Sequence, residues 1–288
     1  MKKFALLLLL CYASLYAKAQ NAVLFKIKYL PSHTYKMAMK MDMNMDMSIS
    51  ADSATMAKMK ASGTKQPMVM QMNSTNSAEI KTGPLTPKRT FALKMTTRPE
   101  ATKVTMNGSA LPMPQQVLNA QTYEGICDAD GKLYVNSSTG DAGNEQVKAA
   151  LIAMINKLQG DIKFPEKPMK VGESFTMEAP MNVPVSGLNL DMVVKTIYTL
   201  TAIKENLAYF NMGMFMNIDI NTQKDGVPIN AKGQGSGTGK FVYSMKNNFA
   251  TNMTSDMTMD LNMAVKEQKM DMTMRMKSDI QNTIAAIK

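Results

Sequence analysis

The chain has 288 residues, an apolar content of 45% and a formal net charge of +10 at pH 7. It contains 32 Met, 9 Tyr and 9 Phe, with no Trp, one His and two Cys. A single His excludes zinc sites built on several His residues, and the scattered Lys residues form no basic run of the kind that binds nucleic acid.

Residues 1–19 have the pattern of a secretory signal peptide. A basic start precedes a short apolar run, and Ala17-Lys18-Ala19 is a small-x-small cleavage site. We expect cleavage after Ala19 and export of residues 20–288 as a single β-rich domain, to the periplasm or the extracellular space. No later segment is apolar for long enough to form a transmembrane helix.

The two Cys residues bear on processing and redox chemistry. Lipoprotein processing is not expected at Cys11, because Leu10 stands before it where a small residue is required. Loss of the signal peptide leaves Cys127 without a partner for an intramolecular disulfide. We predict that Cys127 is a small buried hydrophobe rather than a reactive thiol.

The stretch YKMAMKMDMNMDMSIS, residues 35–50, has Met at every second position. At 100° per residue these side chains would point all round a helix, whereas on a strand they share one face. We therefore predict a long strand with an apolar face and a polar face. The apolar face consists of Met37, Met39, Met41, Met43, Met45 and Met47.

Further strands are expected in the N-terminal half, residues 22–136. Arg98-Pro99-Glu100 is expected to be a turn between two of them, and Asp128-Ala129-Asp130-Gly131 the turn of a hairpin. Residues 51–65 and 108–116 are expected to be loops or short helical turns. The predicted strands are Ala22–Leu30, Thr34–Ser50, Pro67–Asn73, Arg89–Thr97, Thr102–Asn107, Thr122–Cys127 and Lys132–Asn136.

One helix is predicted, from about residue 144 to residue 159. Val147, Leu151, Ile155 and Leu158 form an apolar stripe along it. Asn144 is a suitable N-cap, and Gly160 supplies a C-terminal stop.

The segments after the helix carry a resemblance to a known family. They are Phe164-Pro165-Glu166-Lys167-Pro168 and Val171-Gly172-Glu173-Ser174-Phe175. Together with the helix and the flanking strands, they resemble a domain-of-unknown-function family of secreted, β-rich proteins of Gram-negative envelopes. Members of that family often have Trp where Phe175 stands, and many are lipoproteins, so the chain departs from the pattern twice. The resemblance implies no activity and supplies no catalytic residues.

The C-terminal third, residues 190–281, repeats the alternation and has clear turns, such as Lys224-Asp225-Gly226. We predict a five-stranded antiparallel meander with one apolar face and one face in water. Its strands are Leu190–Ile203, Leu207–Asn221, Ile229–Met245, Met253–Val265 and Met270–Ile280.

The strand Ile229–Met245 is unusual, because Gly occupies four successive inward positions from Gly233 to Gly239. Such a run suggests a sharp bend, or something bulky lying against the strand. We expect that the predicted helix or a ligand lies there. The fold expected from all these elements is mainly β (α+β): a long-stranded, curved antiparallel sheet or half-barrel with one central packed helix. Such a sheet also resembles the lipoprotein-carrier fold, which holds acyl chains.

Catalytic patterns are weak throughout the chain, and we expect neither an enzyme nor a cofactor. His33 lies next to Ser32 but has no nucleophile-elbow motif around it. Asp42 and Asp46 share one side of a strand at roughly 13 Å, too far apart for a glycosidase pair. The segment GSGTGKF, residues 235–241, lacks the first Gly and the final Ser or Thr of a phosphate-binding loop.

Three hypotheses account for the Met stripes. The first is an apolar ligand, such as a lipid tail, held in a Met-lined curved sheet, since Met adapts to irregular ligands. The second is a Cu(I) or Ag(I) site, because thioether sulfur is a soft ligand, with Met37–Met47 as candidate ligands. The third is a structural or interaction protein with a filled core. For the first, the predicted lining is Met212, Met214, Met216, Met257, Met259, Met272 and Met274, with Gly235 and Gly237 as the floor.

Overall fold

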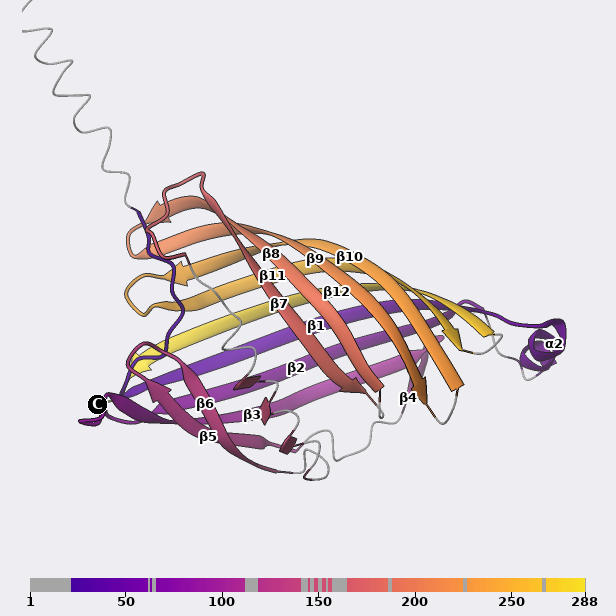
Figure 1. Cartoon of the computed structure of the whole chain (residues 1–288), viewed down its shortest axis with the longest axis horizontal. Helices are drawn as coiled ribbons and strands as arrows, with labels where there is room; N and C mark the ends of the chain where they lie inside the picture. Colours follow the sequence, from indigo (N-terminus) through magenta and orange to yellow (C-terminus); the bar gives the residue numbers. More distant parts are fainter. Residues whose placement is uncertain are drawn as a thin grey trace, which may run out of the picture.

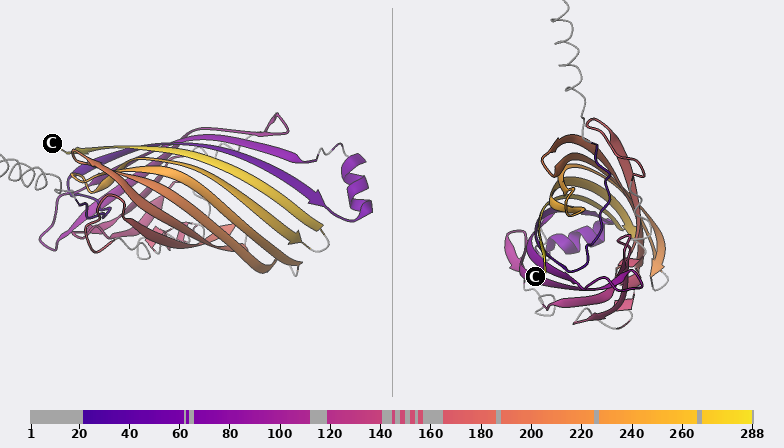
Figure 2. Two further views of the ribbon diagram at one scale, coloured as in Figure 1. Left: turned by 90° about the horizontal axis from the view of Figure 1, so that it is seen from above. Right: turned by 90° about the vertical axis from the view of Figure 1, so that its left-hand side faces the viewer.

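The computed structural model describes residues 22–61, 63, 66–111, 119–140, 145, 148–149, 152–153, 155–156, 165–185, 188–224, 227–265 and 268–287. These residues form one antiparallel sheet of twelve strands and little helix. Figure 1 shows the strands lying side by side in a long, twisted sheet. Seen along its length in Figure 2, the sheet curls into a trough, which the strand pairing leaves open.

The mainly β architecture expected from the alternating pattern is confirmed, with the strands and α2 in the following bounds. They are β1 (His33–Ser50), α2 (Ser53–Ala61), β2 (Met68–Thr82), β3 (Thr90–Met106), β4 (Ser109–Leu111), β5 (Gln121–Asp128), β6 (Leu133–Thr139), β7 (Ser174–Val185), β8 (Leu188–Lys204), β9 (Leu207–Lys224), β10 (Val227–Ser244), β11 (Phe249–Val265) and β12 (Gln268–Ala286).

Across the sheet the strands follow the order β6-β5-β3-β2-β1-β12-β11-β10-β9-β8-β7, and β4 pairs with β3. The first and last strands of the chain are therefore neighbours at the centre. They pair from His33 opposite Ala286 to Ser50 opposite Lys269. This pairing joins the strands of the N-terminal half to the C-terminal meander as one sheet.

The glycine positions of β10 lie on the inner face, as predicted, and each faces large residues on both sides. Gly237 is opposite Met214 of β9 and Met257 of β11, and Gly235 is opposite Met216 and Met259. The Met side chains lean over the glycines, so that a Cβ added at Gly237 would lie 2.5 Å from Met257 Cγ. β9 and β11 consequently come into contact with each other across β10.

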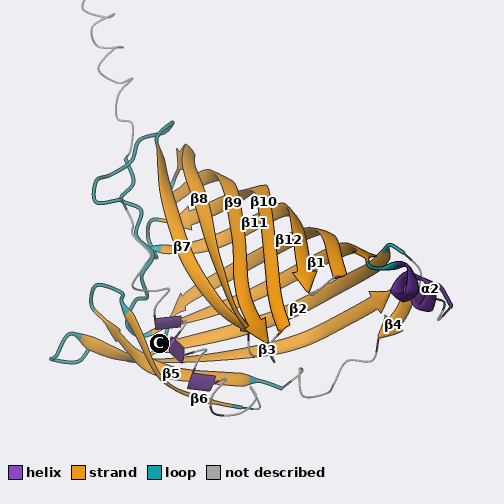
Figure 3. Ribbon diagram, turned by 45° about the vertical axis from the view of Figure 1, so that its right-hand side comes forward, coloured by secondary structure: helices purple, strands orange, loops and turns teal. Residues whose placement is uncertain are grey.

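We call the inward glycines of β10, from Gly233 to Gly239, the glycine track. The prediction that the helix lies over this track was wrong. Residues 145, 148–149, 152–153 and 155–156 are helical, within the predicted range, whereas the expected caps Asn144 and Gly160 lie outside the described residues. Ile152 and Ile155 pack against a cluster that contains Tyr35, Leu133 and Val135, not against the glycines of β10. In Figure 3 these helical residues lie beside β5 and β6, far from α2.

The helix also covers a sheet edge. Asn156 accepts a hydrogen bond from the backbone N–H of Val135 (2.8 Å) and donates one to its carbonyl (3.0 Å). Val135 belongs to β6, an edge strand of the sheet. The amide thus takes the place of a neighbouring strand and satisfies backbone groups that would otherwise be unpaired.

Two predicted elements in the N-terminal half were wrong. Ala22–Leu30 is not a strand: apart from an isolated bridge between Val23 and Met169, it crosses the end of the trough without sheet pairing. Its alternation reflects side chains that plug this end. Arg98-Pro99-Glu100 is not a turn either, because β3 continues through it with a register shift opposite Thr75 and Asn76. A bulge can accommodate a Pro inside a strand.

The glycine track generates a prediction about stability. Gly237→Ala should destabilise the fold by about 1–3 kcal/mol, because the new Cβ meets Asp256 O and Met257 Cγ at 2.5 Å. Gly235→Ala is the matched control, since its nearest contact, 3.2 Å to Thr258 O, needs only a small adjustment. Urea unfolding of both variants measures the difference. Equal losses of unfolding free energy would contradict the proposed packing.

Candidate functional site

The inner face of the trough begins with an aromatic cluster at one end. Phe25, from the segment that crosses this end, has no exposed surface. Its ring centroid lies 4.9–5.9 Å from the centroids of five surrounding aromatic rings. Burial in this cluster raises the pKa of Tyr198 to about 12, because the charged phenolate would lose its contact with water. The phenol therefore stays neutral. The rings around Phe25 are those of Phe175, Tyr198, Phe210, Phe241 and Tyr243.

Backbone bonds hold this segment across the trough. Val23 exchanges two hydrogen bonds with Met169, at 2.9 and 2.7 Å. The Tyr243 hydroxyl donates to the carbonyl of Lys26 at 2.9 Å. The end-on view of Figure 2 shows the segment running across the opening between the walls of the sheet. We call this end of the trough the closed end.

Away from the closed end, Met side chains of neighbouring strands lie directly opposite one another in rows across the sheet. One row contains Met72, Met43, Met276 and Met257, from β2, β1, β12 and β11. The next contains Met70, Met45, Met274 and Met259, and the third contains Met68, Met47 and Met272. Directly paired residues on one face of an antiparallel sheet have Cβ atoms about 4.5–5.5 Å apart. We call these the Met rows.

Burial differs among the Met side chains of the inner face. Met212, Met214, Met257 and Met259, which flank the glycines of β10 in the sheet, are buried. Met216, Met272 and Met274 keep part of their surface exposed, as do Met37 to Met47 on β1. The buried Met side chains of these strands therefore lie on β9 and β11, whereas the Met side chains of β1, β2 and β12 are partly exposed.

The predicted lining residues fall into a buried group and a partly exposed group. All of them lie on the inner face, and Gly235 and Gly237 lie beneath neighbouring Met side chains rather than forming a bare floor. Four of the predicted lining Met residues, Met212, Met214, Met257 and Met259, are buried. The partly exposed Met residues include Met216, Met272 and Met274 and also Met37–Met47, the candidates for a metal site. The pairing of β1 with β12, which the local pattern does not specify, decides this outcome.

The Met rows lie on an uncharged face. None of the inward side chains described below is charged. Charged groups lie on the outer face, where Arg275 binds Asp256 at 2.6 Å and lowers the pKa of that carboxyl group. The inward positions are the odd-numbered residues of 37–49, 229–241 and 253–263 and the even-numbered residues of 68–78, 210–218 and 272–284.

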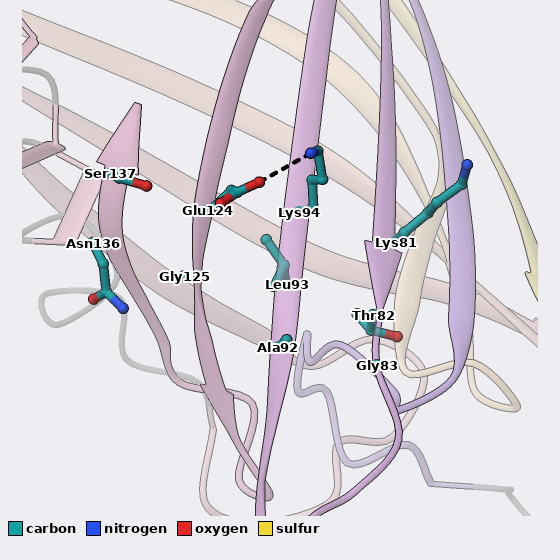
Figure 4. A pocket seen from close by; sticks show the side chains of 10 residues that line it. All are labelled: Lys81, Thr82, Gly83, Ala92, Leu93, Lys94, Glu124, Gly125, Asn136 and Ser137. Atoms are coloured by element: carbon teal, nitrogen blue, oxygen red, sulfur yellow. Dashed lines mark ion pairs between the residues drawn. The ribbon is translucent and has the colours of Figure 1, made fainter. Parts of the chain in front are cut away.

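A hollow of about 580 Å³ lies over β2, β3, β5 and β6 and is shown in Figure 4. Small residues such as Gly83, Ala92 and Gly125 contribute to its lining. Lys94 is paired there with Glu124 at 2.9 Å, and Lys81 with Glu79 at 2.8 Å. The cationic groups are thus already neutralised, and the hollow contains neither His nor Cys.

The other candidates from the sequence have structural roles. Nδ1 of His33 lies 2.7 Å from the carbonyl oxygen of Pro31. Asp128 accepts hydrogen bonds from the N–H groups of Asp130 and Lys132, which closes the hairpin turn. Cys127 is fully buried, as predicted, and burial raises the pKa of its thiol to about 12. Among the described residues, no group of three or more His, Cys, Asp or Glu is placed to hold a metal ion.

The comparisons with known proteins add the following findings. No family model and no curated protein matches the chain. A structure of lipovitellin, concerned with lipid–protein interactions, is 10% identical, covers 91% of this chain and 26% of that chain, and has a TM-score of 0.42. The translocator domain of the autotransporter NalP from Neisseria meningitidis is 8% identical, with coverage of 93% and 95% and a TM-score of 0.22. OccK7 from Pseudomonas aeruginosa is 5% identical, with coverage of 88% and 100% and a TM-score of 0.23.

These TM-scores lie below 0.5, so the similarities carry no argument about function. The chain spans about a quarter of the lipovitellin chain that it matches. Within the described residues, no helix has the length and apolar character needed to cross a membrane.

The closed end generates a prediction. Phe25→Ala should destabilise the fold by about 3–5 kcal/mol, because it empties the centre of the aromatic cluster. Leu24→Ala is the matched control, since the neighbouring side chain is 48% exposed and should contribute little. Chemical denaturation with near-ultraviolet circular dichroism would measure both changes. Similar losses for the two variants would mean that the segment does not plug the trough.

Proposed function

We propose that this chain is an exported, non-enzymatic carrier that holds an apolar ligand, such as a lipid tail, against the Met rows of the trough. The observation that carries the proposal is the uncharged, partly exposed stretch of Met rows over β1, β2 and β12. A continuous stripe of apolar side chains that stay partly accessible to water marks a site for a ligand or partner. The closed end limits how far such a ligand can extend along the trough in one direction.

Physical chemistry supports an apolar chain as the ligand. Each CH₂ group moved from water onto this face contributes about 0.8 kcal/mol. Roughly ten such groups therefore supply on the order of 8 kcal/mol before the costs of association are subtracted. Met is unbranched and polarizable, and it adapts to chains of differing shape better than Val or Ile, although those residues favour strands more.

A charge placed in the Met rows tests the proposal. Met45→Lys should weaken the binding of a fluorescent fatty-acyl probe by about tenfold or more, because an ammonium group must then be desolvated beside the ligand. Asn44→Lys is the matched control: it adds the same charge one residue away, on the outer face, and should change affinity by less than about twofold.

The unaltered protein, purified from its own host, should release lipid on extraction with organic solvent. Mass spectrometry would identify that lipid. Unchanged probe binding by the Met45→Lys variant, with a native circular dichroism spectrum, would refute the carrier function.

A soft-metal function is the second candidate, and the Met rows favour it to a limited degree. The pairing brings thioethers from three strands together, at Met72, Met43 and Met276. Three thioether ligands suit Cu(I). The candidate is weaker because every Met in the rows also contributes to the apolar face on which the fold depends.

Leu substitutions separate the two functions. The double variant Met43→Leu/Met276→Leu keeps the apolar volume but removes the sulfur atoms. The carrier function predicts that affinity for the acyl probe stays within about twofold, since such volume-conserving changes are well tolerated. A metal site predicts instead that anaerobic Cu(I) titration shows at least about a tenfold loss of affinity. Retained Cu(I) affinity in the double variant would exclude this row as the metal site.

A further inference from the structure

A group of polar side chains interrupts the apolar inner face between the aromatic cluster and the Met rows. Ser74 of β2 and Ser278 of β12 lie on either side of Met41, and Ser255 of β11 lies opposite Ser278. Asn76 lies beside Met39, and Asn282 lies beside Met37. We call these five residues, Ser74, Asn76, Ser255, Ser278 and Asn282, the polar band.

The polar band is only partly satisfied by its own hydrogen bonds. The hydroxyl groups of Ser255 and Ser278 are 2.6 Å apart, so one of them donates to the other and the second proton remains available. Asn76 donates to the Ser74 hydroxyl at 2.8 Å, which leaves the Ser74 proton available as well. Asn282 donates to the carbonyl of Ala250, while its Oδ1 atom is buried and has no partner among the described residues.

Folding alone does not account for the polar band. Met or Leu at these inward positions would continue the apolar face, whereas an unsatisfied buried acceptor costs about 1–3 kcal/mol. The four other members of the band are half-buried, so they still offer polar atoms toward the interior of the trough. Hydroxyl and amide groups in this arrangement can both donate to and accept from a neutral polar group.

We infer that the ligand is an uncharged lipid bearing a hydroxyl head group, with the hydroxyl at the polar band and the chain over the Met rows. The inference rests on the proposed carrier function and names its ligand class. An anionic or cationic head group is disfavoured, because no charged side chain lies at the described inward positions to compensate it.

The length of the trough agrees with this arrangement. From Met41, at the polar band, to Ile49, near the end of β1, there are eight residue steps along the strand. At about 3.3 Å per residue this is roughly 26 Å. One leaflet of a bilayer has a hydrocarbon thickness of roughly 15 Å, half of the whole core. The Met rows are therefore long enough for an extended acyl chain that begins at the band.

Three probes with the same chain test the head group: hexadecanol, hexadecane and hexadecyl phosphate. Each would compete with the fluorescent acyl probe for the full-length secreted protein. Hexadecanol should bind about tenfold more tightly than hexadecane, because its hydroxyl uses hydrogen bonds that hexadecane leaves unmade. Hexadecyl phosphate should bind more weakly than hexadecanol.

The double variant Ser255→Ala/Ser278→Ala should remove most of the preference for hexadecanol and leave hexadecane binding unchanged. The matched control is Ser48→Ala/Ser236→Ala, which removes two hydroxyl groups from the outer face and should preserve the preference. Ser74→Ala provides an independent single change within the band, and thermal unfolding would verify that each variant is folded.

The outcomes distinguish this inference from the carrier function. Equal binding of all three probes, sensitive to Met45→Lys but not to the band variants, would overturn the inference and leave the carrier intact. Tightest binding of hexadecyl phosphate would also overturn it. If none of the three probes binds, both the inference about the head group and the carrier function are overturned.

Discussion

The pairing of β1 with β12 is the interaction on which the rest of the structure depends. It joins the strands that precede the helix to the meander that follows it, and its register runs without interruption from His33 to Ser50. Because side chains alternate with a period of two, a slip by one residue would turn every Met of β1 toward water. The same register aligns Met from four strands into rows. The alternating Met residues of single strands thereby form one continuous apolar surface across the sheet.

The size of side chains across the sheet determines which part of that surface is filled. Over β10, glycine between two strands of Met lets the flanking thioethers lie over the backbone, and Met212, Met214, Met257 and Met259 are buried there. Over β1, Met stands between further Met residues of β2 and β12, and no small residue accommodates the neighbouring side chains. Those side chains remain partly exposed. The glycine track therefore accompanies buried Met side chains on β9 and β11, next to the partly exposed Met side chains of β12, β1 and β2 in the same sheet.

Much of this architecture follows from the sequence, because alternation over 18 residues leaves few alternatives to a strand. The strands of the C-terminal meander, the inward glycines and the burial of Cys127 were also predicted correctly, whereas Asp225 and Gly226 of the expected turn lie outside the described residues. What the sequence could not provide was the pairing between distant strands. The segment around Phe25 was expected in the sheet, because a plug and a strand show the same alternation. The polar band was missed because Ser74, Ser255 and Ser278 are unremarkable singly and meet only through the register.

The open wall requires that the sheet edges be protected from pairing with other chains. At one edge, β7 contains Pro180 and Pro184, which lack a backbone N–H group and weaken any added strand. At the other edge, Asn156 occupies the hydrogen-bonding groups of Val135 on β6. Chain-to-chain pairing at the edges is therefore disfavoured, while the Met rows over β1, β2 and β12 stay partly exposed between them. A partly exposed apolar face combined with blocked edges favours a small apolar ligand over a second protein strand as the partner of this sheet.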